Sequence, residues 1–284
     1  MLKDLALGFR SYLMAIRFII KHKLWVYFFF PMLMFVFIYY LGATFEEWKI
    51  QASTATTEDD IWVKIIRALE YGLYTALAFM VFKFMRYILI ILLSPVLSIV
   101  SERVERIIAG NVYKFNLKQL IKDIKRTINL SIRNLIWEFG TVYSIYLIIA
   151  IFSWVFSIPE QISTMLETSI SMLIGFYYYG FSFIDYLNER RRLSISESVT
   201  FVKKHKGFAI ALGSVFTLLF HYSNIYFVSI KDDLTNNAFM TLVIFSSVIM
   251  SIIPIITIVA ATLGVHELVD LTTNPYALKN KESE

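Results

Sequence analysis

The stretch LSPVLSIVSERVERIIAG, residues 93–110, marks the point where an apolar part of the chain becomes charged. Ser94 is a favourable N-cap residue, and Pro95 suits the first turn of a helix. Beyond them, apolar residues recur at helical spacing while charged residues occupy the opposite face. Gly110 is typical of a helix end. The stretch therefore predicts that the chain leaves a hydrocarbon environment at Ser94, starts a new capped helix and continues along a membrane surface.

The composition of the whole chain indicates that lipid forms part of its solvent. Of its 284 residues, 57% are apolar and only 17% are charged, and there are 25 Phe and 17 Tyr. Soluble domains carry about 25% charged residues, so this chain has too few charges to cover its apolar surface. The absence of cysteine excludes disulfides, thiolate chemistry and cysteine-ligated metals.

Apolar segments approach the length of about 20 residues that a helix needs to cross a bilayer. They predict an all-α integral membrane protein with four to six membrane-embedded helices, some of them re-entrant hairpins, in a single membrane domain over residues 1–284. The fourth segment is short and is the one least suited to a full crossing. The segments are residues 24–44, 71–93, 139–158, 168–184, 207–230 and 238–265.

The basic residues predict the orientation of these segments, because cytoplasmic loops are enriched in Lys and Arg. Of the 27 Lys and Arg residues, 21 fall in the two ends of the chain and in residues 94–138 and 185–206. We therefore expect both termini to be cytoplasmic and the acidic loop between Glu46 and Glu70 to face outward. Residues 94–138 form a cytoplasmic-side amphipathic segment in this interpretation, with basic helices against membrane lipids.

Lys83 and Arg86 are the strongest candidates for a functional site. They interrupt an apolar segment and lie three residues apart, so they share a helical face. A cation at the centre of a membrane span costs about 2.5–3.5 kcal/mol on insertion scales and normally faces protein or water. One interpretation is contact with an anion on a permeation path. The other is that both side chains extend to the cytoplasmic interface.

The sequence contains no pattern that favours an enzyme. Its four histidines are scattered, and no nucleophile triad, phosphate-binding loop or metal-ligand spacing is present. We therefore expect no catalytic residues, no bound metal and no cofactor. A net charge of +5 is explained by cytoplasmic loops, so nucleic acid is not an expected partner.

Several stretches together resemble one known membrane protein family. The stretch from Ser94 to Glu105 is similar to that family's small–Pro–apolar segment followed by Glu-Arg-Val-Glu. Further matches are the aromatic-Asp-Tyr segment, the basic turn after it and a late Pro with a small-residue element, found here at residues 183–186, 190–195, 205–208, 254 and 260–262. The chain is thereby identified as a divergent member of the CysZ-type sulfate permease family, within the etoposide-induced protein superfamily.

The resemblance implies a multi-pass protein of the bacterial cytoplasmic (inner) membrane that mediates sulfate uptake as a homo-oligomer. It also implies long spanning helices together with hairpins that penetrate the bilayer only part way. Two departures separate this chain from the family. The Arg pair before the first proline-containing span is absent, leaving Lys21 and Lys23 as weaker anion-path candidates, and residues 221–242 look inserted.

Two functions follow from these observations. The first is a permease or channel for a small inorganic anion, sulfate by resemblance, with passive conduction because no energy-coupling motif is present. The second is a non-transporting membrane scaffold, in which the basic helices serve only lipid contact.

Overall fold

The computed structural model describes residues 1–53, 61–113, 117–230, 236–273, 276 and 278–279, without the side chains of some positions inside the helices. Helices dominate this part of the chain. In chain order the elements are α1 (Leu2–Lys21), η1 (Leu24–Phe28), α2 (Phe29–Ser53), α3 (Ile61–Ala109), β1 (Asn111–Val112), α4 (Leu117–Phe156), α5 (Glu160–Arg190), α6 (Ile195–Lys204), α7 (Lys206–Ile230), α8 (Asn236–Leu268), η2 (Leu271–Thr273) and β2 (Leu278–Lys279).

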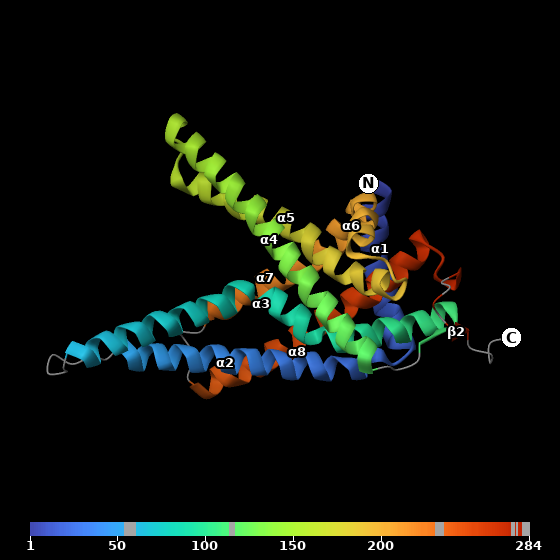
Figure 1. The fold of residues 1–284 in the computed structure, drawn as a ribbon, viewed down its shortest axis with the longest axis horizontal. Coiled ribbons are helices and arrows are strands. Elements are labelled where there is room, and N and C mark those ends of the chain that lie inside the picture. The colour runs from blue at the N-terminus through green and yellow to red at the C-terminus, as the bar shows by residue number, and fades with distance from the viewer. Residues whose placement is uncertain (54–60, 114–116, 231–235, 274–275, 277, 280–284) are drawn as a thin grey trace.

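Long helices pair into antiparallel arms that leave a common base (Figure 1). One arm is formed by α2 and α3, and the other by α4 and α5; the two arms diverge, as Figure 1 shows. A further pair, α7 and α8, packs between α1, α2, α3 and α5. The short antiparallel pair β1–β2 joins the end of α3 to the C-terminal segment.

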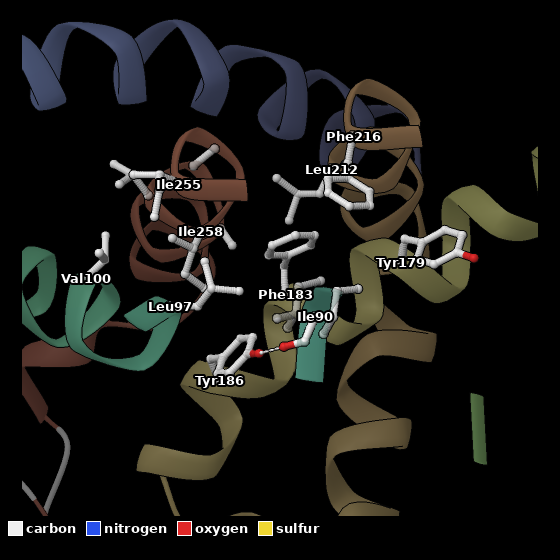
Figure 2. Close-up of a cluster of buried hydrophobic side chains, with 14 of the residues drawn as sticks. Ile90, Leu97, Val100, Tyr179, Phe183, Tyr186, Leu212, Phe216, Ile255 and Ile258 are labelled. Carbon is white, nitrogen blue, oxygen red and sulfur yellow. Dashed lines mark hydrogen bonds between the residues drawn. The ribbon is translucent and has the colours of Figure 1, made fainter. Parts of the chain in front are cut away.

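The base contains the apolar core, which is shown in Figure 2. Four helices contribute fully buried side chains to it, namely Leu97 and Val100 of α3, Phe183 of α5, Leu212 of α7, and Ile255 and Ile258 of α8. The Tyr186 hydroxyl donates a hydrogen bond of 3.1 Å to the Ile90 carbonyl, which ties α5 to α3 inside this core. The base is therefore the densely packed part from which the arms extend.

Helices α5 and α7 approach each other so closely that only glycine fits at two contacts. A Cβ added at Gly180 would lie 1.8 Å from the Ala209 carbonyl oxygen. A Cβ added at Gly213 would lie 1.7 Å from the Phe176 carbonyl oxygen. Small residues at helix interfaces allow this backbone contact in membrane proteins.

The structure confirms an all-α membrane protein. Each of the expected apolar segments falls mainly on one long helix, the first also including η1. The described residues contain four stretches that are long and apolar enough to cross a membrane. These are Leu24–Gln51, Tyr87–Ala109, Ile124–Phe156 and Met250–Leu268.

The expected helix start at Ser94 is wrong, because α3 runs without a break from Ile61 to Ala109 with Pro95 inside it. The apolar face after Pro95 explains the difference. Leu97, Val100 and Val104 are completely buried, so this face packs in the core and not against a lipid surface. Packing of that kind supports a helix across a proline within a membrane protein.

Residues 94–109 accordingly form the end of α3, and residues 117–138 form the beginning of α4. Their position relative to the membrane remains a prediction. Helix α1 has the surface expected of an interfacial helix, since Phe9, Leu13, Ile16 and Ile20 are all exposed. Its other face packs on α7 and α8, where the Tyr12 hydroxyl donates to the Leu212 carbonyl at 2.7 Å.

Candidate functional site

The buried face of α4 is polar, whereas its exposed face is apolar. Thr127, Ser131, Asn134 and Glu138 recur at spacings of four, three and four residues, so they share one face of the helix. Their exposed fractions are 7%, 2%, 0% and 4%. The outer side of the same helix carries large apolar side chains that are more than half exposed, including Ile132, Ile136 and Trp137. This arrangement reverses the polarity of a helix in a water-soluble protein.

Helix α3 presents a second polar row with the same spacing. Ser94, Ser98, Ser101 and Glu105 follow one another at four, three and four residues. Ser94, Ser101 and Glu105 are at most 3% exposed. Helix α5 adds three buried polar residues, Ser182, Asp185 and Asn188. We call these rows of α3, α4 and α5 the polar seam.

A buried ion pair closes the seam between α3 and α5. Arg190 Nε donates to Glu105 Oε2 at 2.9 Å, and Arg190 Nη2 donates to the Ser101 hydroxyl. Glu105 Oε1 also accepts hydrogen bonds from Asn111 Nδ2 at 2.7 Å and from the Tyr113 hydroxyl at 2.5 Å. The Glu105 carboxylate is therefore compensated by one guanidinium and two neutral donors, as a buried charge requires.

A second buried ion pair joins α4 to α5. Arg126 donates to both carboxylate oxygens of Asp185, with Nε–Oδ2 at 3.1 Å and Nη2–Oδ1 at 2.8 Å. Asp185 Oδ1 also accepts from the Ser198 hydroxyl, which itself accepts from Asn188 Nδ2 at 2.9 Å. Arg126 reaches the Leu193 carbonyl at 2.5 Å as well. This network holds the turn between α5 and α6 against α4.

Several donors of the seam have no hydrogen-bond partner among the residues that the structure describes. The buried atoms Ser94 Oγ, Ser131 Oγ and Asn134 Nδ2 make no hydrogen bond. Buried polar groups are normally paired, and each unpaired group costs about 1–3 kcal/mol. The α3 and α4 rows therefore have unused capacity for water or an ion.

A crevice lies beside one of these donors, Ser94, between α3, α4 and α5. It is too narrow for a water molecule in this conformation. Its walls are formed by Ser94, Pro95, Ser98, Ile124, Thr127, Tyr186 and Glu189.

Glu138 lies at the other end of the α4 row. Its Oε2 accepts a hydrogen bond from the Tyr87 hydroxyl of α3. A Cβ added at Gly175 of α5 would lie 3.3 Å from Glu138 Oε1. A carboxyl group buried in a membrane segment is a functional-site hypothesis by default.

The structure describes the side-chain surroundings of only two of the four residues predicted from sequence, Lys21 and Lys23. Lys83 and Arg86 lie on α3, but their side chains are outside the described part of the chain. Lys21 and Lys23 are exposed at the end of α1, where Lys23 adopts a left-handed conformation with φ 55°. The role of these four residues in an anion path remains a prediction.

Sequence reasoning missed the α4 row, although its spacing was visible. Polar residues at four, three and four positions inside an otherwise apolar segment predict one polar face. Whether that face turns inward depends on neighbouring helices. Two of the segments that resemble the family contact each other in the structure, because Glu105 of the first forms an ion pair with Arg190 of the second. Among the residues that the structure describes, no cluster of three His, Asp or Glu could hold a metal ion.

Comparison with protein families gives one match. The family model described as sulfate transporter CysZ/etoposide-induced protein 2.4 covers residues 11–230, which is more than half of the chain. No curated protein matches this chain.

Proposed function

Because the chain belongs to the family of the sulfate transporter CysZ and etoposide-induced protein 2.4, we propose that it is a membrane permease for a small inorganic anion. The family is one of transporters and not of enzymes. Sulfate is the first candidate substrate, the polar seam is the proposed path, and conduction is passive. The protein acts in a bacterial inner membrane as a homo-oligomer with both termini in the cytoplasm.

The observation that carries this proposal is the reversed polarity of α4. A helix that faces lipid with Ile132 and Ile136 and faces protein with Ser131 and Asn134 has the distribution expected of a pathway lining. Hydroxyl and amide groups without partners can replace part of the hydration shell of an ion. A helix that served only for lipid anchorage would have no need of this buried polar row.

The charges of the seam are compatible with an anion. Arg190 compensates Glu105, Arg126 compensates Asp185, and the Tyr87 hydroxyl donates to Glu138. The Glu105 and Asp185 carboxylates, each paired with a guanidinium, therefore place little uncompensated negative charge along the path. The crevice beside Ser94 does not admit a water molecule, so an ion would pass that point only if α3, α4 and α5 moved apart.

The test is uptake of labelled sulfate by proteoliposomes that contain the purified protein. Thr127→Val and Ser131→Ala each remove one hydroxyl from the α4 row with little change in volume. Losing one hydrogen bond to an ion costs about 1.5–3 kcal/mol, so we expect flux to fall by about tenfold or more. Ile136→Leu, on the exposed face of the same helix, is the control and should retain wild-type flux.

The alternative function, a non-transporting scaffold, predicts a different result. Wild-type protein that is folded and correctly inserted would then pass neither sulfate nor any other small anion. That result would overturn the permease proposal. If Thr127→Val and Ser131→Ala both retain wild-type flux, the protein is still a permease, but the polar seam is not its path.

A further inference from the structure

Arg133 differs from the other arginines of the α4–α5 contact, because no carboxylate of the described residues forms an ion pair with it. It lies seven residues after Arg126, so both point toward α5 from the same side of α4. Arg126 meets Asp185. Arg133 instead places its guanidinium carbon 5.9 Å from the centre of the Phe181 ring. Among the described residues, Arg133 forms no ion pair.

Asn134 lies beside this guanidinium and orients toward it. Arg133 Nη1 donates to Asn134 Oδ1 at 3.1 Å. Because this bond uses Asn134 Oδ1, the Asn134 Nδ2 group remains available to donate a hydrogen bond. Asn134 is completely buried, and its Nδ2 has no hydrogen-bond partner. One turn earlier on the same face, Ser131 Oγ is also buried and unpartnered.

Aromatic residues of α5 complete the surroundings. Tyr177 and Tyr178 are near enough to Arg133 to interact with it electrostatically. Figure 1 shows α4 and α5 running side by side along this arm. A positive group, a spare amide donor and a spare hydroxyl thus gather on α4, and the adjacent face of α5 offers rings in place of carboxylates.

We propose that Arg133 and Asn134, with Ser131 beside them, form a binding site for a tetrahedral oxyanion. This inference deepens the proposed function, because it names a contact point for the anion. A sulfate, an inorganic phosphate and the phosphate of an anionic lipid share the relevant chemistry, namely several acceptor oxygens around a negative charge. Such a group accepts from the guanidinium fork and from Asn134 Nδ2 together, and it neutralises a cation that otherwise lacks an opposite charge.

The geometry of a guanidinium makes the prediction specific. Arg donates through a planar fork that matches two oxygens of an oxyanion, whereas Lys supplies a point charge. Arg133→Lys should therefore bind more weakly than wild type, and Arg133→Gln should bind more weakly still. Asn134→Leu removes the amide at similar volume and should also weaken binding.

The experiment measures two quantities on protein purified in a mild detergent. One is saturable binding of labelled sulfate, with unlabelled phosphate as competitor. The other is the anionic phospholipid that remains bound, measured by native mass spectrometry. Lys125→Gln removes an exposed basic residue of α4 without touching the site and is the matched control. Helix content by circular dichroism must match wild type for each variant.

We expect Arg133→Gln to weaken sulfate affinity by about tenfold or more, or to remove a bound lipid phosphate, while Lys125→Gln changes neither. Loss of sulfate binding alone identifies a free oxyanion as the occupant, and loss of lipid alone identifies a headgroup. If Arg133→Gln and Asn134→Leu both behave as wild type in the two measurements, the site does not exist.

This outcome is separable from failure of the permease. Binding that depends on Arg133 without any wild-type flux would retain the site and overturn the transport function. If the wild type transports sulfate but binding does not depend on Arg133, the transport function is retained and the Arg133 site is overturned.

Discussion

Arg190 of α5 and Glu105 of α3 form a buried ion pair, with Nε and Oε2 2.9 Å apart and side chains that are 10% and 1% exposed. The two residues are separated by 85 positions in the chain. Their contact joins the α2–α3 arm to the α4–α5 arm at the base. The Ser101 hydroxyl, which accepts from Arg190, also lies 2.7 Å from the Thr262 hydroxyl and so connects α8 to the same cluster. Movement of one arm against the other must strain this cluster.

Breaking the pair from one side should destabilise the protein strongly. Arg190→Gln leaves Glu105 buried without its cation, which costs about 3–5 kcal/mol for a buried pair. We expect a large fall in the melting temperature measured by size-exclusion chromatography after heating. The double variant Glu105→Gln/Arg190→Gln should recover part of the loss, because no charge is then left alone.

The exposed pair of Arg10 and Glu267 supplies the control for this experiment. Its atoms are 3.8 Å apart, and the side chains are 67% and 38% exposed. A surface pair of this kind contributes about 0–1 kcal/mol, so Arg10→Gln should leave the melting temperature almost unchanged. Equal losses at Arg10 and Arg190 would contradict the buried character of the second pair.

The α5–α7 contact should tolerate no side chain at Gly180 or Gly213. A Cβ there would overlap a backbone carbonyl of the partner helix, so the helices must separate and the packing around them must loosen. Gly180→Ala and Gly213→Ala are expected to lower the yield of monodisperse protein severely. Gly140→Ala is the matched control, since a Cβ at that position meets nothing within 4 Å. It should be neutral or slightly stabilising, because alanine favours a helix over glycine.

The divergence of the two arms predicts where the tip of the α4–α5 arm ends. The α2–α3 and α4–α5 arms diverge in Figure 1. If the α2–α3 arm crosses the bilayer, we therefore expect the other arm to enter it obliquely and to end within the membrane. The chain has no cysteine, so single cysteines can be introduced cleanly. We expect Glu47→Cys, near the far end of α2, to react with an impermeant maleimide from outside the cell. Glu160→Cys, at the start of α5, should not. Labelling of both positions from outside would show that the α4–α5 arm crosses completely.

Acid should loosen the start of α6. Ser194 and Glu197 form a capping box, in which the Ser194 backbone N–H donates to Glu197 Oε2 at 2.7 Å. That hydrogen bond lowers the pKa of Glu197 below its ordinary value. A carboxyl group with a lowered pKa stabilises the folded state above its unfolded-state pKa, and the stabilisation disappears as the pH falls through the folded-state pKa.

Hydrogen–deuterium exchange of the first turn of α6 measures this effect. Protection should decrease from pH 6 to pH 3 in the wild type, after correction for intrinsic exchange. Glu197→Gln preserves the capping pattern without a titrating group, so its protection should not depend on pH in this range. A pH dependence that survives in this variant would assign the effect to another residue.

The comparison between sequence and structure is most informative around Ser94. Local signals at Ser94 and Pro95 predicted a new helix, since an N-cap residue followed by proline is a common helix start. The structure continues α3 through both residues because Leu97, Val100 and Val104 find partners on α5 and α8. Local sequence cannot report those partners, because α5 and α8 lie far from α3 along the chain.

The sequence by itself determined that this protein is helical and that lipid is part of its solvent, because segment length, apolar content and the shortage of charge depend only on composition and local order. It also carried the family resemblance, through short motifs that are local. Only the tertiary structure decided that the polar face of α4 turns inward, that Glu105 meets Arg190, and that Arg133 has no carboxylate opposite it in the part of the chain that the structure describes. These features depend on which faces of distant helices pack together, and helical spacing defines a face without specifying what it contacts.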